Sequence, residues 1–116
     1  MNDLNNYYIM DEKGNPKRLE SFDDWAKWYE TANRSIARDE FRRKSGETEE
    51  VVVSTVFLGI DHSFGFDSEP LLYETMIFGM KFDGENDYEG YQVRYSTLEE
   101  ALNGHAKAIT IAAKRS

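Results

Sequence analysis

The sequence predicts an α+β fold in which a mainly antiparallel sheet of about five or six strands packs against two helices. Several strand-length apolar segments follow one another with connections too short for a crossover, which favours antiparallel pairing. Residues 22–32 and 97–114 instead carry apolar side chains at helical spacing and need a sheet face to cover. The predicted order is β-β-α-β-β-β-β-α, and residues 1–116 fit a single domain.

A short hairpin is predicted for residues 7–10 and 16–19. Gly14 and Asn15, followed by Pro16, are typical of a turn. Because proline has no backbone N–H to donate to a neighbouring strand, Pro16 places the second strand at a sheet edge.

The first predicted helix follows this hairpin. Ser21 is a suitable N-cap, and Asp23 and Asp24 in the first turn interact favourably with the helix dipole. Helical spacing then places Phe22, Trp25, Trp28, Tyr29 and Ala32 in one apolar stripe. We expect this helix to lie across a sheet face, with both tryptophans in the core.

The next two segments are predicted to form a pair of strands. Residues 35–43 fit either a helix or a strand, and the strand is preferred because residues 45–48 then form a hairpin loop. Residues 50–60 are apolar on both faces, which predicts a central strand that is covered on both sides.

The remaining elements are two strands and a final helix. Residues 71–80 and 91–95 are predicted to be strands. An acidic loop at residues 61–70 precedes the first of them, and a second acidic loop at residues 83–90 separates the two. The pairs Ser96 with Glu99 and Thr97 with Glu100 both fit a capping box before helix 97–114. Its predicted apolar face carries Leu98, Ala101, Leu102, His105, Ile109 and Ala112.

Composition excludes several classes of protein. A net charge of −8 repels nucleic-acid phosphates and anionic membranes, so we expect no direct nucleic-acid binding. No apolar run approaches the roughly 20 residues of a membrane-spanning helix, and the first residues do not resemble a signal peptide. The absence of cysteine excludes thiolate catalysis and cysteine-ligated zinc. We therefore expect a cytoplasmic protein without membrane contact.

Two histidines and a carboxylate mark a candidate site. His62 follows the predicted central strand, His105 lies in the apolar stripe of the last helix, and Glu74 shares a strand face with apolar residues. Asp61, His62 and His105 are candidate ligands of a divalent metal, although no known metal motif or cofactor is predicted. His62, Glu74 and His105 would alternatively share acid–base catalysis. The structural interpretation is a core histidine, a loop histidine and a glutamate in an ion pair, with Arg94, His62 and His105 as the candidate partners of Glu74.

Acidic residues strongly outnumber basic ones between residues 61 and 89. This stretch has eight acidic residues and one lysine, whereas residues 34–44 contain five basic residues. Aromatic side chains interrupt the acidic segments, and aromatic residues anchor many protein interfaces. These segments predict either a surface that binds a basic protein or a solvated rim. The candidate binding residues are Phe64, Phe66, Asp67, Glu69, Asp83, Glu85, Asp87 and Tyr88.

Several segments of the chain resemble a known family, namely Trp25–Trp28, Ser54–His62, Leu72–Gly79, and Tyr95–Ala101 followed by Gly104 and His105. They are similar to small uncharacterised proteins encoded by bacteriophages and prophages, and together they extend over most of the chain. The stretch from Thr55 to His62 is the most specific part. The resemblance implies a phage origin and a host cytoplasm, and it implies no established activity.

Two classes of function follow from the sequence. The first is a phage accessory protein that binds a host or phage protein through its acidic loops, possible targets being a host defence or nucleic-acid enzyme. The second is a small metal-dependent or acid–base enzyme, or a small-ligand binder, centred on His62, Glu74 and His105. In either class, a homodimer formed through an edge strand or an aromatic helix face is also compatible with the sequence.

Overall fold

The computed structural model describes residues 7–42, 50–61, 69–79 and 91–115, which form six strands and two helices. Along the chain these elements are β1 (Tyr7–Met10), β2 (Pro16–Leu19), α1 (Phe22–Thr31), β3 (Ser35–Arg42), β4 (Glu50–Phe57), β5 (Tyr73–Phe78), β6 (Gln92–Tyr95) and α2 (Leu98–Arg115). The predicted α+β class and the predicted order of elements are confirmed.

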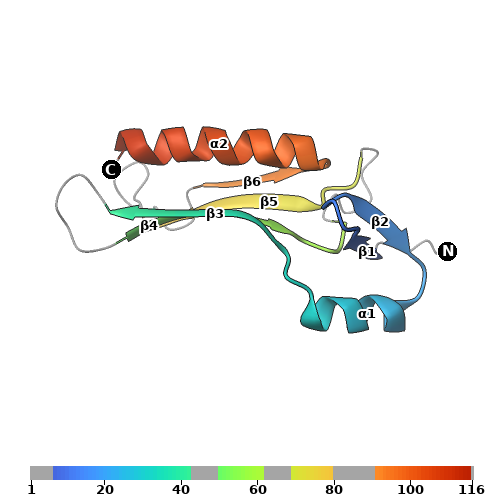
Figure 1. Ribbon diagram of the computed structural model, residues 1–116. Coiled ribbons are helices and arrows are strands. Elements are labelled where there is room, and N and C mark those ends of the chain that lie inside the picture. The colour runs from blue at the N-terminus through green and yellow to red at the C-terminus, as the bar shows by residue number, and fades with distance from the viewer. Residues whose placement is uncertain (1–6, 43–49, 62–68, 80–90, 116) are drawn as a thin grey trace.

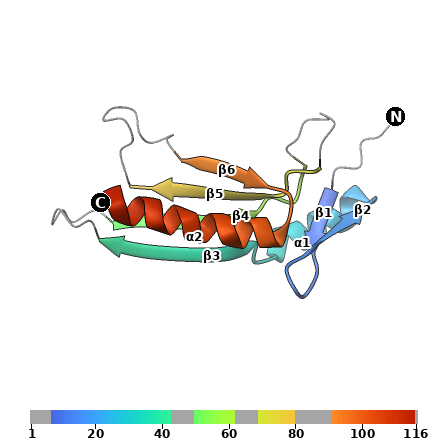
Figure 2. The same ribbon diagram turned by 90° about the horizontal axis from the view of Figure 1, so that it is seen from above.

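The strands form two antiparallel sheets instead of the single sheet that we expected. β3, β4, β5 and β6 make a four-stranded sheet in that order, and β1 pairs with β2 in a separate hairpin. An isolated bridge between Tyr7 and Ile60 joins the hairpin to the chain just after β4. The hairpin therefore extends the molecule at one end, and the principal-axis extents are 51 × 28 × 22 Å (Figures 1 and 2).

Helix α2 lies along one face of the four-stranded sheet, as Figure 1 shows from the side and Figure 2 from above. Beneath it the valines of β4 alternate, so that Val51 and Val53 are fully buried. One core cluster joins Val51, Val53, Ile77, Ala108 and Ala112, and a second joins Phe57, Leu72, Tyr73 and Ala101.

Among the described residues, no helix is long and apolar enough to cross a membrane.

The opposite face of β4 is not covered in the way the sequence predicted. Val52 and Val56 point away from α2 and are only half-buried, although they are as apolar as the valines on the covered side. Both helices were expected to cover this sheet, but α1 packs against β1 and β2. Apolar character on both faces of a strand therefore did not indicate burial on both sides.

Helix α1 is fixed to the hairpin by Trp25. Ser21 caps the helix by accepting a hydrogen bond from the Asp24 amide, as predicted. The Trp25 indole nitrogen donates to the carbonyl oxygens of Tyr8 and Gly59, both at 3.1 Å, so one ring links α1, β1 and the chain just after β4. Trp25 is buried, which confirms its predicted core position, whereas Phe22 remains 54% exposed.

Residues 35–42 form a strand, which confirms the preferred interpretation of this ambiguous segment. Regular alternation would place Ile36 and Phe41 on opposite faces, yet both side chains pack against core clusters. The register shifts between Ser35 and Ala37, so Ile36 is the extra residue of a bulge. The bulge turns both apolar side chains towards the core.

Helix α2 begins with the predicted capping box of Thr97 and Glu100. The Thr97 hydroxyl accepts from the Glu100 amide, and the Glu100 carboxylate accepts from the Thr97 amide. The predicted apolar face is rotated slightly, because Leu102 is 47% exposed while Ala108 is fully buried. Small side chains therefore form most of the surface that meets the sheet.

Gly104 allows α2 to approach the ring of Tyr95. A Cβ atom at position 104 would overlap the Tyr95 hydroxyl and the adjacent ring carbons. The Tyr95 hydroxyl is buried and, within the described part of the chain, has no hydrogen-bond partner. Close packing against the sheet thus accounts for a glycine inside the helix.

Gly104→Ala is expected to lower the free energy of unfolding, because the added methyl group collides with Tyr95. In a Tyr95→Val background the ring is absent, and the same change should raise that free energy by up to about 1 kcal/mol through helix propensity. Urea unfolding of the four variants measures both effects. Destabilisation of similar size in both backgrounds would contradict the assigned role of Tyr95.

Tyr73 links the sheet to the hairpin, since its hydroxyl donates to the Gly14 carbonyl oxygen at 2.7 Å. Burial, assisted by the charge of Asp11, raises the pKa of Tyr73 from 10.0 to about 12. The folded state therefore favours the protonated phenol. Its contribution to stability is complete below pH 10 and is lost as the pH rises towards about 12.

Tyr73→Phe is expected to lower the free energy of unfolding at neutral pH by about 1 kcal/mol, because it removes this hydrogen bond. It should also flatten the decline in stability between pH 10 and about 12. Urea unfolding at several pH values tests both statements, with Tyr7→Phe as the matched control. A decline that is as steep in Tyr73→Phe as in the control would disprove the assignment.

Candidate functional site

A chain of polar side chains runs through the interface between α2 and the sheet. His105 on α2 places Nε2 2.8 Å from an Asp39 carboxylate oxygen and Nδ1 2.7 Å from the Thr55 hydroxyl. The Thr55 hydroxyl in turn forms a hydrogen bond with the hydroxyl of Thr75. One residue from each of α2, β3, β4 and β5 therefore contributes to this Asp39–His105–Thr55–Thr75 chain.

The order of groups in this chain, carboxylate to imidazole to hydroxyl, is the one that activates a nucleophile in hydrolytic enzymes. Burial decides against that use here. Thr55 and Thr75 have no exposed surface, and His105 is 5% exposed, so a substrate cannot reach the hydroxyl groups. Asp39 alone reaches the surface, with about half of its side chain exposed.

The polar chain satisfies His105 in either protonation state. When Nδ1 is bare it accepts from the Thr55 hydroxyl, and when Nδ1 is protonated it donates to the same oxygen. The hydroxyl groups of Thr55 and Thr75 rotate to match. A buried imidazole is thereby kept fully hydrogen-bonded, which explains how His105 occupies a core position.

The structure does not bring Glu74 and His105 together. Thr75 faces α2, so its neighbour Glu74 points to the opposite face of the sheet. Asp61 accepts a hydrogen bond from the Leu71 amide at 2.9 Å, which fixes the chain just before β5. His62 lies outside the described residues. Within the described part of the chain, no three histidine or carboxylate groups converge as metal ligands would.

Glu74 is buried by its neighbours on the sheet, as the sequence suggested. One carboxylate oxygen lies 3.0 Å from Nε of Arg94 and 2.6 Å from the Gln92 amide nitrogen. Arg94 faces Glu74 directly in the antiparallel register. Of the two candidate partners that the structure describes, Arg94 lies beside Glu74 and His105 does not.

The aromatic and acidic residues predicted to bind a partner lie almost entirely outside the described residues. Phe64, Phe66 and Asp67 belong to segment 62–68, and Asp83, Glu85, Asp87 and Tyr88 belong to segment 80–90. Glu69 is described and exposed. In sequence, one segment precedes β5 and the other follows it, and the two ends of β5 are about 20 Å apart for a strand of this length.

Three arginines, Arg34, Arg38 and Arg94, are engaged by neighbouring groups. Arg34 lies over the Tyr29 ring and donates to the Phe57 carbonyl oxygen. Arg38 and Arg94 form ion pairs with Glu40 and Glu74, respectively. Of these contacts, only the one between Arg94 and Glu74 was among the candidates that the sequence offered.

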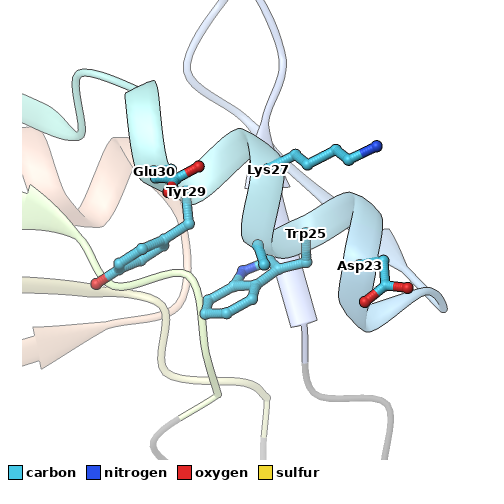
Figure 3. A pocket seen from close by; sticks show the side chains of 6 residues that line it. Asp23, Trp25, Lys27, Tyr29 and Glu30 are labelled. Carbon is cyan, nitrogen blue, oxygen red and sulfur yellow. The ribbon is translucent and has the colours of Figure 1, made fainter.

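A surface hollow of about 410 Å³ lies against α1 and is lined by Asp23, Trp25, Ala26, Lys27, Tyr29 and Glu30. Figure 3 shows that the rings of Trp25 and Tyr29 extend to one side, whereas Asp23 and Lys27 point to the other. The Trp25 indole N–H is already bonded to two carbonyl oxygens. The polar groups therefore do not converge on a common point, as they would in a ligand site.

Comparison of the chain with family models, with curated proteins and with solved structures gives no match.

Thr55→Val tests the structural role of the polar chain. The substitution leaves His105 Nδ1 and the Thr75 hydroxyl without their buried partner, so the free energy of unfolding should fall by about 1–3 kcal/mol. Thr110→Val on the exposed side of α2 is the matched control and should change it by less than about 0.5 kcal/mol. Urea unfolding of both variants measures these two changes. Equal effects would contradict a stabilising role for the polar chain.

Proposed function

We propose that this protein is a small acidic accessory protein of bacteriophage type, which acts in the host cytoplasm by binding a host or phage protein. The resemblance of several sequence segments to phage and prophage proteins supports this origin. Interference with a host defence protein or a nucleic-acid enzyme is the specific form proposed, because an acidic surface competes with phosphates for a basic groove.

The observation that carries this proposal is the distribution of charge. The chain has a net charge of −8, and the stretch from residue 61 to 89 has eight acidic residues and one lysine. Arg38 and Arg94 are used in local ion pairs, and Arg34 contacts Tyr29 and Phe57. Arg94 thus pairs with Glu74, one of the eight acidic residues, while Arg34 and Arg38 are engaged outside this stretch. The three arginines are therefore held away from its other seven carboxylates, which favours attraction of a basic partner.

Binding is preferred to catalysis because of how the reactive groups are used. His105 and its threonine partners are sealed between α2 and the sheet. Glu74 is held by Arg94 and Gln92 on the other face. His105 and Glu74, two of the three residues of the predicted acid–base site, thus support the fold from two separate places.

Charge reversal in segment 83–87 tests the proposal. The triple variant Asp83→Lys, Glu85→Lys and Asp87→Lys should bind the partner at least about tenfold more weakly, because electrostatic attraction is lost. The partner is first captured from host lysate on the immobilised wild-type protein and identified. Its affinity is then measured with purified components at increasing salt, where wild-type binding should weaken.

The matched control carries the same change in net charge at exposed sites of the hairpin and α1, namely Glu12→Lys, Glu20→Lys and Glu30→Lys. If both triple variants weaken binding equally, only net charge matters and segment 83–87 is not the binding surface. If wild-type binding does not depend on salt, the electrostatic proposal itself is wrong.

A further inference from the structure

Within the part of the chain that the structure describes, no helix lies over one face of the four-stranded sheet. Figure 1 shows α2 on one side of β3, β4 and β5, while α1 lies at the hairpin end of the molecule. We call the side away from α2 the open face. It includes Arg38 and Glu40 on β3, Val52, Ser54 and Val56 on β4, Glu74, Met76 and Phe78 on β5, and Gln92 and Arg94 on β6, and the register adds Arg42 and Glu50, of opposite charge, at the far end of β3 and β4.

The centre of the open face is apolar. The register places Val52 opposite Phe78, and Ser54 opposite Met76, so these side chains lie side by side across β4 and β5. Phe78 is 47% exposed, and Val52 and Met76 are half-buried. A contiguous apolar surface of this kind, bordered by polar side chains, is typical of a protein-binding site.

The charges of the open face distinguish between possible partners. Arg38 and Glu40 lie on the β3 side, and Glu74 and Arg94 lie on the β6 side, so the described charges of this face sum to zero. The whole chain carries −8. A strongly basic partner gains nothing from a neutral face, whereas a face with both signs is complementary to a second copy of itself.

We propose that the open face is a two-fold interface between two copies of this chain. Arg38 and Glu40 are two residues apart on the same side of β3. A two-fold axis that crosses the strands between them sets Arg38 of each copy opposite Glu40 of the other. The same axis sets Met76 opposite Phe78, which removes the exposed ring from water.

The size of the open face indicates a weak dimer. Four strands about 4.8 Å apart and about 20 Å long present a footprint of roughly 400 Å². A stable interface usually buries about 800 Å² on each partner. We therefore expect monomers and dimers to exchange reversibly, with the dimer populated only at high protein concentration.

Salt should strengthen this dimer. Two copies that each carry −8 repel one another at a distance, although their contacting faces are neutral. Raising the salt from about 0.01 M to about 0.1 M shortens the Debye length from about 30 Å to about 10 Å, which screens this repulsion. Binding to a basic partner has the opposite salt dependence, so self-association and the proposed function are separable.

Sedimentation velocity of the full chain at increasing protein concentration and at two salt concentrations tests the interface. The wild type should shift from monomer towards dimer, and more so at the higher salt. Phe78→Lys should remain monomeric, because it places a charge in the apolar centre. Leu102→Lys, which adds the same charge at an equally exposed apolar position on α2, should dimerise like the wild type.

Charge exchange on β3 provides a second test that does not depend on the apolar centre. Arg38→Glu should weaken the dimer, and the double variant Arg38→Glu with Glu40→Arg should restore it, because both contacts across the two-fold axis are re-formed. Circular dichroism and unfolding midpoints confirm that each variant is folded. A wild type that stays monomeric at every concentration overturns the proposal, as does equal dimerisation of Phe78→Lys and Leu102→Lys.

Discussion

The packing of α2 against one face of the four-stranded sheet is the interaction on which the other features of the structure depend. A sheet face of mostly apolar side chains must be covered, and within the described residues α2 is the helix that covers it. Ala101, Ala108 and Ala112 are fully buried, so the helix meets the sheet through small side chains. This close approach also requires Gly104, because Tyr95 occupies the space where a side chain would be.

Polar side chains that are buried at this interface need hydrogen-bond partners within it. His105 faces the sheet from α2, and the hydroxyl groups of Thr55 and Thr75 with the carboxylate of Asp39 complete its hydrogen bonds. Helix α1 does not cover the opposite face of the four-stranded sheet, because Trp25 fixes α1 to the hairpin and to Gly59. The consequence is a sheet with one sealed face, which contains a satisfied polar chain, and one face over which no helix of the described residues lies.

Local signals in the sequence were sufficient to predict the elements. Ser21 and Thr97 begin the two helices as their capping patterns indicated, because such bonds join residues three apart. The sequence alone did not show which helices and strands contact one another. Val52 and Val53 are the same residue type, and nothing local shows which of them lies beneath α2.

The candidate site was predicted in part. Glu74 was expected to need a charged partner, and it has Arg94. Its separation from His105 depends on strand alternation and on which face α2 covers, and both are long-range properties. Asp39 was missed altogether, because in sequence it is one carboxylate among many charged residues of β3. The bulge at Ile36, which sets the register near Asp39, has no clear sequence signal.

The most direct measurement compares the two faces of β4 in solution. Methyl groups of valine are labelled, and their relaxation by a soluble gadolinium chelate is recorded by NMR at low protein concentration. We expect strong relaxation for Val52 and Val56 and protection for Val51 and Val53, because these pairs point to opposite faces. At high concentration Val52 should become protected as the dimer forms. Equal protection of all four valines at low concentration would contradict an open face.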